Sequence, residues 1–133
     1  MQSNQRLRLS LFLLRIGIFI VMFIWTMDKF FNTDHAISVF KRYYYLDIPT
    51  TQVVFGLAIA ESVLLLAFLA GLKKKWTYGA VLALHSVSTL SAFKQYLAPW
   101  TSPNLLFFAA WPMLAACVAL YLLREEDTFM VLK

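Results

Sequence analysis

The chain contains few of the residues that build covalent or metal-centred sites. Its single cysteine, Cys117, lies within an apolar stretch, which excludes an internal disulfide, a Cys-x-x-Cys redox pair and a cysteine-ligated metal. Of its two histidines only His85 lies in an apolar block, whereas His35 lies between two blocks. A haem held by two histidines inside one bundle is therefore not expected. With no metal site and no recognisable nucleophilic triad, we expect no catalytic residue and no catalytic activity of the chain alone.

Charged residues are scarce as well. They make up 14% of the 133 residues, whereas 61% are apolar; a soluble domain is about a quarter charged and about half apolar. The apolar residues form four blocks, at 9–31, 51–72, 76–97 and 104–123. Each block has the roughly 20 residues that a helix needs to cross about 30 Å of hydrocarbon, and none alternates as a barrel strand does. We therefore predict an all-α integral membrane protein of one domain, residues 1–133, folded as a four-transmembrane-helix bundle.

The basic residues predict how this bundle sits in its membrane. With four spans, both termini and the second connection share one side, which carries seven basic residues outside the spans: Arg6, Arg8, Lys73, Lys74, Lys75, Arg124 and Lys133. The other side carries Lys41 and Arg42 in its connections. The positive-inside rule then places both termini in the cytoplasm, and we expect a bacterial inner membrane. Topology and membrane lipid account for the net charge of +5, so no nucleic-acid partner is expected.

The first outer loop, residues 32–50, is the only long connection, and we expect it to contain a short helix. Thr33 or Asp34 can cap this helix. Side chains that can cover the bundle then recur at helical spacing: Ile37, Phe40, Lys41 and Tyr44. Three consecutive tyrosines at 43–45 suit the boundary between water and lipid, where a ring can keep its hydroxyl wet. The sequence thus predicts an interfacial helix over the outer end of the bundle.

Six ionisable side chains lie inside the predicted spans: Arg15, Asp28, Lys29, Glu61, His85 and Lys94. A charge at the bilayer centre costs about 2.5–3.5 kcal/mol on insertion scales, so such residues often mark a site. Glu61 lies about 15 Å deep at 1.5 Å per residue, and His85 lies at a similar depth. Either His85 or Lys29 can pair with the Glu61 carboxyl. Trp25, Asp28 and Lys29 share one face of the first span.

A polar pocket that opens outward is the arrangement these residues predict. On the third span, polar or small residues lead outward from His85: Ser88, Thr89, Ala92 and Tyr96. This stripe and the face that carries Trp25 are expected to line the pocket beneath the tyrosines. The candidates for ligand binding or proton handling are Glu61, His85, Lys29, Asp28, Trp25 and Arg15.

Each candidate also has a purely structural interpretation. Arg15 and Lys94 can extend to the two interfaces on their long side chains. Asp28 and Lys29 can anchor the first span at the interface, and His85 can hydrogen-bond to a neighbouring helix. The second span also carries small residues along one side, which we expect to pack tightly inside the bundle: Gly56, Ala60, Ala67 and Gly71.

A pattern of residues runs through the first two spans. The first span reads Leu14-Arg15-Ile16-Gly17-Ile18-Phe19 and then Thr26-Met27-Asp28-Lys29-Phe30. The second is preceded by Ile48-Pro49, carries Gly56 and Glu61, and ends in Ala70-Gly71-Leu72. This pattern, over residues 9–78, resembles the DoxX family of small four-span membrane proteins. Arg15, Lys29 and Glu61 fall on the family's characteristic Arg, Lys and Glu, whereas Thr26 and Phe30 stand where members usually have Gly and Leu.

The resemblance implies a four-span fold and, more loosely, a role in membrane redox chemistry. Relatives include a subunit of thiosulfate:quinone oxidoreductase and components of superoxide-linked membrane complexes, and others are assembly factors or chaperones of membrane proteins. Our first hypothesis is an accessory subunit of a membrane redox complex that contacts quinone and other membrane subunits or a second copy of itself. A membrane-protein assembly factor and a small proton-coupled or solute transporter are the alternatives, because fold does not fix function.

Overall fold

The computed structural model describes residues 2–45 and 51–132; residues 1, 46–50 and 133 lie outside the described residues, and with them Pro49, which was expected to precede the second span. Within the described ranges the chain forms helices and no strands. The long helices are α1 (Ser3–Phe31), α3 (Thr51–Leu69), α4 (Lys74–Ser91) and α6 (Ala110–Leu122). The short elements are α2 (Thr33–Tyr43), α5 (Phe93–Tyr96) and the 3₁₀ turns η1 (Asn104–Ala109) and η2 (Arg124–Glu126). The predicted all-α class is confirmed.

Three helical stretches are long and apolar enough to cross a membrane. They are Ser3–Phe31, Thr51–Leu69 and Asn104–Leu122, with mean hydropathies of 2.3, 2.2 and 2.1. Many of their large apolar side chains point away from the protein, among them Ile20, Ile24 and Val63. Such an exposed apolar surface is unfavourable in water and suits lipid. These are the properties of a membrane protein.

The helix bounds differ from the predicted apolar blocks in all four blocks, and most in the first and the third. α1 begins at Ser3, within the polar residues before the first block, where Gln5 Oε1 accepts a hydrogen bond from the Gln2 N–H at 2.9 Å. The third block, 76–97, is divided between α4 and α5 at Ala92. The Tyr96 hydroxyl donates to the Thr89 carbonyl oxygen at 2.8 Å and so satisfies a backbone acceptor near the end of α4.

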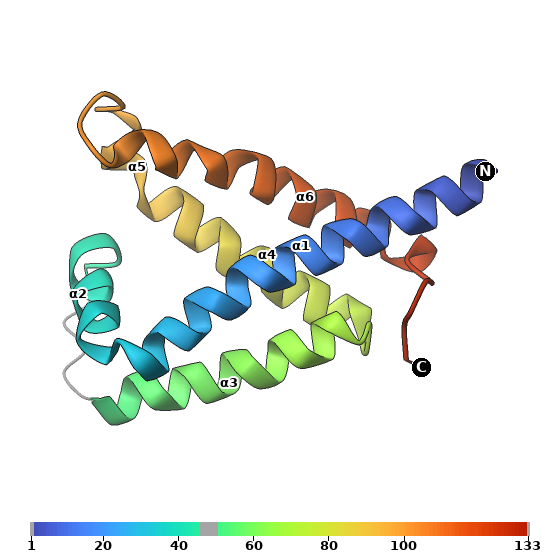
Figure 1. The fold of residues 1–133 in the computed structure, drawn as a ribbon, viewed down its shortest axis with the longest axis horizontal. Helices are drawn as coiled ribbons and strands as arrows, with labels where there is room; N and C mark the ends of the chain where they lie inside the picture. Colours follow the sequence, from blue (N-terminus) through green and yellow to red (C-terminus); the bar gives the residue numbers. More distant parts are fainter. Residues whose placement is uncertain (1, 46–50, 133) are drawn as a thin grey trace.

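Each of the four long helices packs against two others. α1 lies against α3 and α6, and α4 lies against the same two helices. Figure 1 shows both chain ends and the α3–α4 turn at one end of the molecule, which we call the terminal end. α2 and α5 lie at the opposite end, which we call the loop end. The chain therefore runs back and forth between the two ends.

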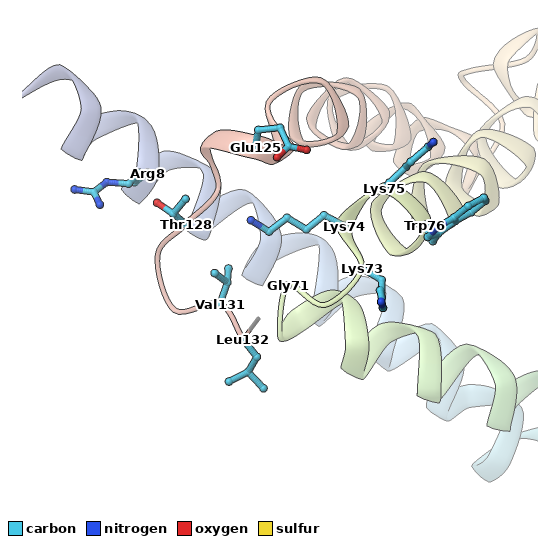
Figure 2. A pocket seen from close by; sticks show the side chains of 10 residues that line it. All are labelled: Arg8, Gly71, Lys73, Lys74, Lys75, Trp76, Glu125, Thr128, Val131 and Leu132. Carbon is cyan, nitrogen blue, oxygen red and sulfur yellow. The ribbon is translucent and has the colours of Figure 1, made fainter.

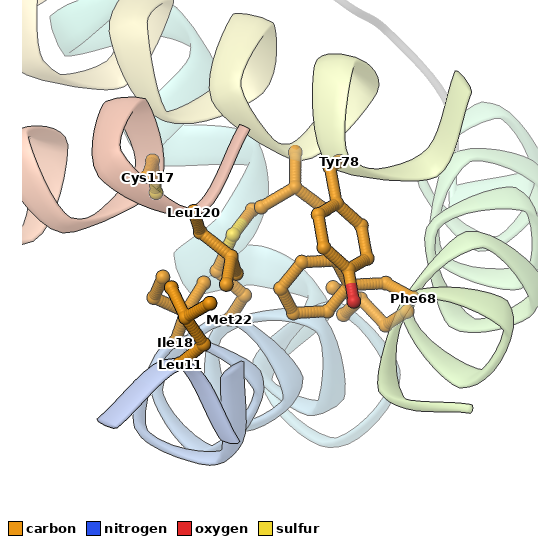
Figure 3. Close-up of a cluster of buried hydrophobic side chains, with 9 residues drawn as sticks. Leu11, Ile18, Met22, Phe68, Tyr78, Cys117 and Leu120 are labelled. Atoms are coloured by element: carbon orange, nitrogen blue, oxygen red, sulfur yellow. The ribbon is translucent and has the colours of Figure 1, made fainter. Parts of the chain in front are cut away.

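One apolar core joins the four long helices (Figure 3). α1 contributes a single stripe of buried residues at spacings of three and four: Leu11, Arg15, Ile18, Met22 and Thr26. Opposite this stripe the other three helices contribute further buried side chains: Leu65, Phe68, Tyr78, Val81, Cys117 and Leu120. Because the stripe also carries a charged and a hydroxyl residue, α1 brings polar groups into the interior at both ends of the core.

The short helix expected between the first and second apolar blocks is present as α2. It begins at Thr33 after Asn32, and neither Thr33 nor Asp34 serves as its cap residue. The Thr33 hydroxyl instead donates to the Lys29 carbonyl oxygen at 3.0 Å and so satisfies an acceptor at the end of α1. The turn between α1 and α2 is thus a single residue, which holds α2 close to the helix before it.

The three tyrosines at the end of α2, Tyr43, Tyr44 and Tyr45, connect it to the second half of the chain. Each contacts a different partner at the loop end: the Tyr43 ring lies 5.6 Å from the Phe107 ring, the Tyr44 hydroxyl lies 2.8 Å from Ser88 Oγ, and Lys94 Nζ lies 5.0 Å from the Tyr45 ring centroid. Lys94 is exposed there, in accord with the structural interpretation of its long side chain. The tyrosines therefore cover part of the loop end of the bundle.

The small-residue side of α3 is largely turned away from the bundle. Gly56 and Ala60 are exposed, and a Cβ placed on Gly56 would meet nothing within 4 Å. The buried face of α3 is formed by other residues: Val54, Ala58, Leu65 and Phe68. The expectation that the small residues pack inside the bundle is therefore wrong for Gly56 and Ala60, because the helix is rotated to bring Phe68 and Leu65 into the core. Gly71, beyond the end of α3, is buried.

Candidate functional site

Glu61 is held by two residues of α1. Its Oε2 atom lies 3.1 Å from Lys29 Nζ and 2.9 Å from Thr26 Oγ1. Thr26 and Lys29 are three residues apart and lie on the same side of α1, which packs along α3. Of the two pairings that the sequence left open, the structure forms the one with Lys29. The side chains of Lys29 and Glu61 are 15% and 23% exposed, so the ion pair is largely but not fully covered.

The Thr26 hydroxyl can serve either protonation state of the Glu61 carboxyl. Thr26 Oγ1 lies 2.9 Å from Glu61 Oε2 and also 2.8 Å from the Met22 carbonyl oxygen. A hydroxyl has one hydrogen to donate and can also accept. When Glu61 is ionised, Thr26 can donate to it; when Glu61 carries a proton, it can donate to Thr26, which then donates to Met22. A proton can therefore enter or leave this carboxyl without leaving Thr26 unpaired.

His85 is buried between α1 and α6. Its side chain is 1% exposed, and its Nε2 atom lies 3.0 Å from the Ala110 carbonyl oxygen. Because a carbonyl oxygen only accepts, Nε2 carries the hydrogen in this contact. The other ring nitrogen, Nδ1, is buried and has no hydrogen-bond partner among the described residues. The neutral ring therefore keeps an unused acceptor in the interior, a costly arrangement unless a donor reaches it.

Trp25 covers the ring of His85. The two ring centroids lie 6.1 Å apart at an interplanar angle of 24°, which is a stacked arrangement. The Trp25 side chain itself is 48% exposed. Trp25 is adjacent to Thr26 in the chain and one turn before Lys29. One turn of α1 thus contacts both His85 and Glu61.

The polar stripe on α4 faces inward as the spacing predicted. Thr89 and Ala92 are buried, and Ser88 and Tyr96 are half-buried. The Thr89 hydroxyl donates to the His85 carbonyl oxygen at 2.7 Å. These residues extend from His85 to the loop end, where the Tyr44 hydroxyl meets Ser88.

Asp28 does not join Glu61 and His85. Its Oδ2 atom lies 2.6 Å from His35 Nδ1, and its Oδ1 atom accepts from Asn32 Nδ2 at 3.3 Å. His35 is exposed and belongs to α2. Asp28 therefore connects the end of α1 to α2.

Arg15 lies in a separate network at the terminal end. It is about 16 Å along α1 from Thr26 at 1.5 Å per residue, and its side chain is 1% exposed. Its Nη1 atom lies 3.2 Å from Asp127 Oδ2 and 3.3 Å from the Tyr78 hydroxyl. Its Nη2 atom donates to two carbonyl oxygens of the C-terminal segment, those of Phe129 and Met130. The C-terminal segment thus folds back onto Arg15 and pairs its charge within the protein.

Sequence reasoning missed the partners of Arg15. Asp127 is fully buried, its Oδ2 atom accepts from the Tyr78 hydroxyl at 2.5 Å, and its backbone oxygen accepts from Lys74. In the sequence Asp127 belongs to an acidic run after the last apolar block, which suggests a solvated terminus. The one available signal was Arg15 itself, because a charge inside a span needs a partner.

Within the part of the chain that the structure describes, no group of three or more His, Cys, Asp or Glu side chains is placed to hold a metal ion. The residues that come together at the loop end are therefore Trp25, Thr26 and Lys29 from α1, Glu61 from α3 and His85 from α4. They combine an ion pair, a buried ring nitrogen without a hydrogen-bond partner among the described residues and a half-exposed aromatic surface. No family model, curated protein or solved structure matches the chain.

Proposed function

We propose that this chain spans the membrane four times and acts as an accessory subunit of a membrane redox complex, in which it contacts a quinone. The fourth span would be α4. α3 ends at the terminal end and α6 begins near the loop end (Figure 1), so the chain between them returns across the molecule. The 18 residues of α4 cover about 27 Å at 1.5 Å per residue, close to the thickness of the hydrocarbon core.

The positive-inside rule supports a cytoplasmic terminal end. The α3–α4 turn, with Lys73, Lys74 and Lys75, lies at the same end as both chain termini. α2 and its tyrosines would then lie at the outer surface of a bacterial inner membrane, α2 along the interface. The candidate site would open toward that surface.

The observation that carries the quinone proposal is the turn of α1 that contacts both Glu61 and His85. Thr26 and Lys29 bind the Glu61 carboxyl, while Trp25 stacks on His85. A quinone has a flat ring, which packs well against an indole, and two carbonyl oxygens, which accept hydrogen bonds. Lys29 and a protonated His85 can both donate to such oxygens. The apolar tail of a quinone suits the lipid-facing surface around Trp25.

The chemistry required of the chain is proton transfer. Reduction of a quinone to a quinol takes two electrons and two protons, and each proton forms a new O–H bond on a ring oxygen. Glu61, with Thr26 ready to bond either protonation state, and His85, with its free Nδ1, would deliver or receive those protons. A partner redox subunit would supply or accept the electrons, which makes this chain an accessory rather than a complete oxidoreductase.

Native mass spectrometry of the chain extracted from its own membrane in mild detergent tests this proposal. We expect a redox subunit or an adduct with the mass of a quinone on the wild type. The variant Trp25→Leu should lose the quinone adduct, because it removes the stacking surface. Trp100→Leu is the matched control, since Trp100 is an exposed tryptophan in the loop before η1. A wild type that carries neither adduct nor partner, and takes up no added ubiquinone or menaquinone, would overturn the proposal.

A second candidate function is that of a membrane-protein assembly factor. The observation that favours it is the exposed small-residue side of α3, where Gly56 and Ala60 let another helix approach closely. On this account Gly56→Leu and Ala60→Leu should abolish partner binding, whereas Glu61→Gln should leave it largely intact. Val87→Phe, at an exposed apolar position of α4, is the control for added bulk. Partner capture that depends on Glu61 and not on Gly56 would remove this candidate.

A further inference from the structure

A pocket of about 660 Å³ lies at the terminal end, between the α3–α4 turn and the C-terminal segment (Figure 2). Its lining carries four basic residues and one acidic residue: Arg8, Lys73, Lys74, Lys75 and Glu125. Arg8 comes from α1, the lysines from the turn and the start of α4, and Glu125 from η2. The positive charge of this pocket is therefore assembled from separate parts of the chain.

The walls of the pocket are fixed by contacts far apart in sequence. The Leu132 N–H donates to the Ala70 carbonyl oxygen at 2.7 Å, and Gly71 lies directly against Val131. Lys74 reaches across to the backbone oxygen of Asp127, whose carboxylate pairs with Arg15. The C-terminal segment therefore contacts the α3–α4 turn near its beginning, at Asp127, and near its end, at Leu132. These contacts hold the two walls of the pocket together.

The pocket is amphipathic as well as basic. Val131 and Leu132 contribute apolar surface, and Thr128 contributes a hydroxyl. Trp76 stands at the edge with its ring 72% exposed, and Lys75 Nζ lies 5.6 Å from that ring's centroid. An indole at the end of a span is typical of the headgroup region of a bilayer. Four basic side chains and one carboxylate favour binding of an anion. The apolar edge favours an anion that is attached to an apolar group.

We infer that this pocket binds the headgroup of an anionic phospholipid from the adjacent leaflet. Its phosphate would lie among Arg8, Lys73 and Lys75, with its glycerol and upper acyl chains against Leu132 and Trp76. Basic pockets between spans on the cytoplasmic side bind such headgroups, with about 1 kcal/mol from each Lys or Arg near the surface, which is about five-fold in affinity. A free inorganic phosphate would gain the charge contacts but not the apolar ones.

The test is a titration of the purified full-length chain in neutral detergent, with the thermal unfolding midpoint as readout. Phosphatidylglycerol should raise the midpoint in a saturable way, while phosphatidylcholine and inorganic phosphate at equal concentrations should not. The triple variant Arg8→Gln, Lys73→Gln and Lys75→Gln should need about 100-fold more phosphatidylglycerol for the same shift. Lys74 is left in place because it also holds Asp127.

The matched control removes the same charge elsewhere. Arg6, Lys41 and Arg42 lie outside the pocket lining. The triple variant Arg6→Gln, Lys41→Gln and Arg42→Gln should therefore show the same phosphatidylglycerol titration as the wild type. An equal loss in both triple variants would overturn the inference, because net charge alone would then attract the lipid. Equal shifts with phosphatidylcholine, or with inorganic phosphate, would also overturn it, since the pocket would then not select an anionic lipid.

Discussion

At the scale of single residues, Arg15 is the most heavily bonded charge in the described chain. Its guanidinium reaches Asp127, the Tyr78 hydroxyl and two backbone oxygens of the C-terminal segment. Arginine can do this because its planar fork presents several donors at fixed angles, whereas lysine offers one compact ammonium group. Burial of the Arg15–Asp127 ion pair costs desolvation free energy, and the additional hydrogen bonds of the guanidinium offset that cost.

Arg15→Lys should therefore destabilise the protein even though it keeps the charge. We expect a loss of about 2–3 kcal/mol in the free energy of unfolding, because at least two hydrogen bonds to a charged group disappear. This change in the free energy of unfolding can be measured by titration with a denaturing detergent, with circular dichroism as the readout. Arg6→Lys, at an exposed position of α1, should change the free energy by less than about 0.5 kcal/mol. Equal stability of Arg15→Lys and wild type would contradict the network.

The Lys29–Glu61 and Arg15–Asp127 ion pairs show which residue contacts can be predicted from a sequence. Lys29 was one of two expected partners of Glu61, because span depth and side-chain length limit which groups can meet. Asp127 could not be assigned to Arg15, since 112 residues separate them and no periodicity reports that a terminal segment folds back. The sequence also could not predict that His85 Nδ1 lacks a hydrogen-bond partner among the described residues. Which ring nitrogen is bonded is set by the Ala110 carbonyl oxygen, which belongs to another helix.

At the scale of elements, the turn between α3 and α4 depends on one glycine. Gly71 has φ +73°, a left-handed conformation that a side chain makes unfavourable. An added Cβ would also lie 2.6 Å from Val131 Cγ1. The C-terminal segment can lie over this turn only because Gly71 has no side chain.

Gly71→Ala should lower the free energy of unfolding by about 2 kcal/mol, from backbone strain and the clash with Val131. Limited proteolysis should at the same time cut the C-terminal segment faster. Gly56→Ala is the control, because nothing lies within 4 Å of its added Cβ and alanine is the better helix former. In the double variant Gly71→Ala and Val131→Ala, part of the lost free energy of unfolding should be recovered, because the clash with Val131 is relieved. An unperturbed Gly71→Ala protein would show that the segment does not lie on the turn.

The elements themselves were predictable to different degrees. Apolar blocks of span length predicted α1, α3 and α6, and helical spacing between the first two blocks predicted α2. The break between α4 and α5 was not visible, because it involves a Tyr96 side-chain bond to the Thr89 backbone within an apolar block. The orientation of α3 was misjudged, since both of its sides are apolar and small residues alone do not say which side faces the bundle.

At the scale of the whole molecule, we expect four spans with both termini on the same side. In a Cys117→Ala background, Gln2→Cys and Ser102→Cys place single thiols at exposed positions of opposite ends. In intact cells or right-side-out vesicles, a membrane-impermeant maleimide should label the Ser102→Cys thiol and spare the Gln2→Cys thiol until the membrane is permeabilised. Labelling of both thiols from one side would contradict four spans, and labelling of the Gln2→Cys thiol alone would reverse the orientation.

The central claim is that one turn of α1 and the facing His85 and Glu61 form a quinone site, and photo-crosslinking tests it most directly. The wild-type chain in its native membrane would be irradiated with a photoreactive ubiquinone or menaquinone analogue, and the labelled peptides would be located by mass spectrometry. We expect label within residues 22–29, 58–64 or 82–89, lost when unmodified quinone competes. Label confined to other segments, or label that unmodified quinone does not displace, would contradict it.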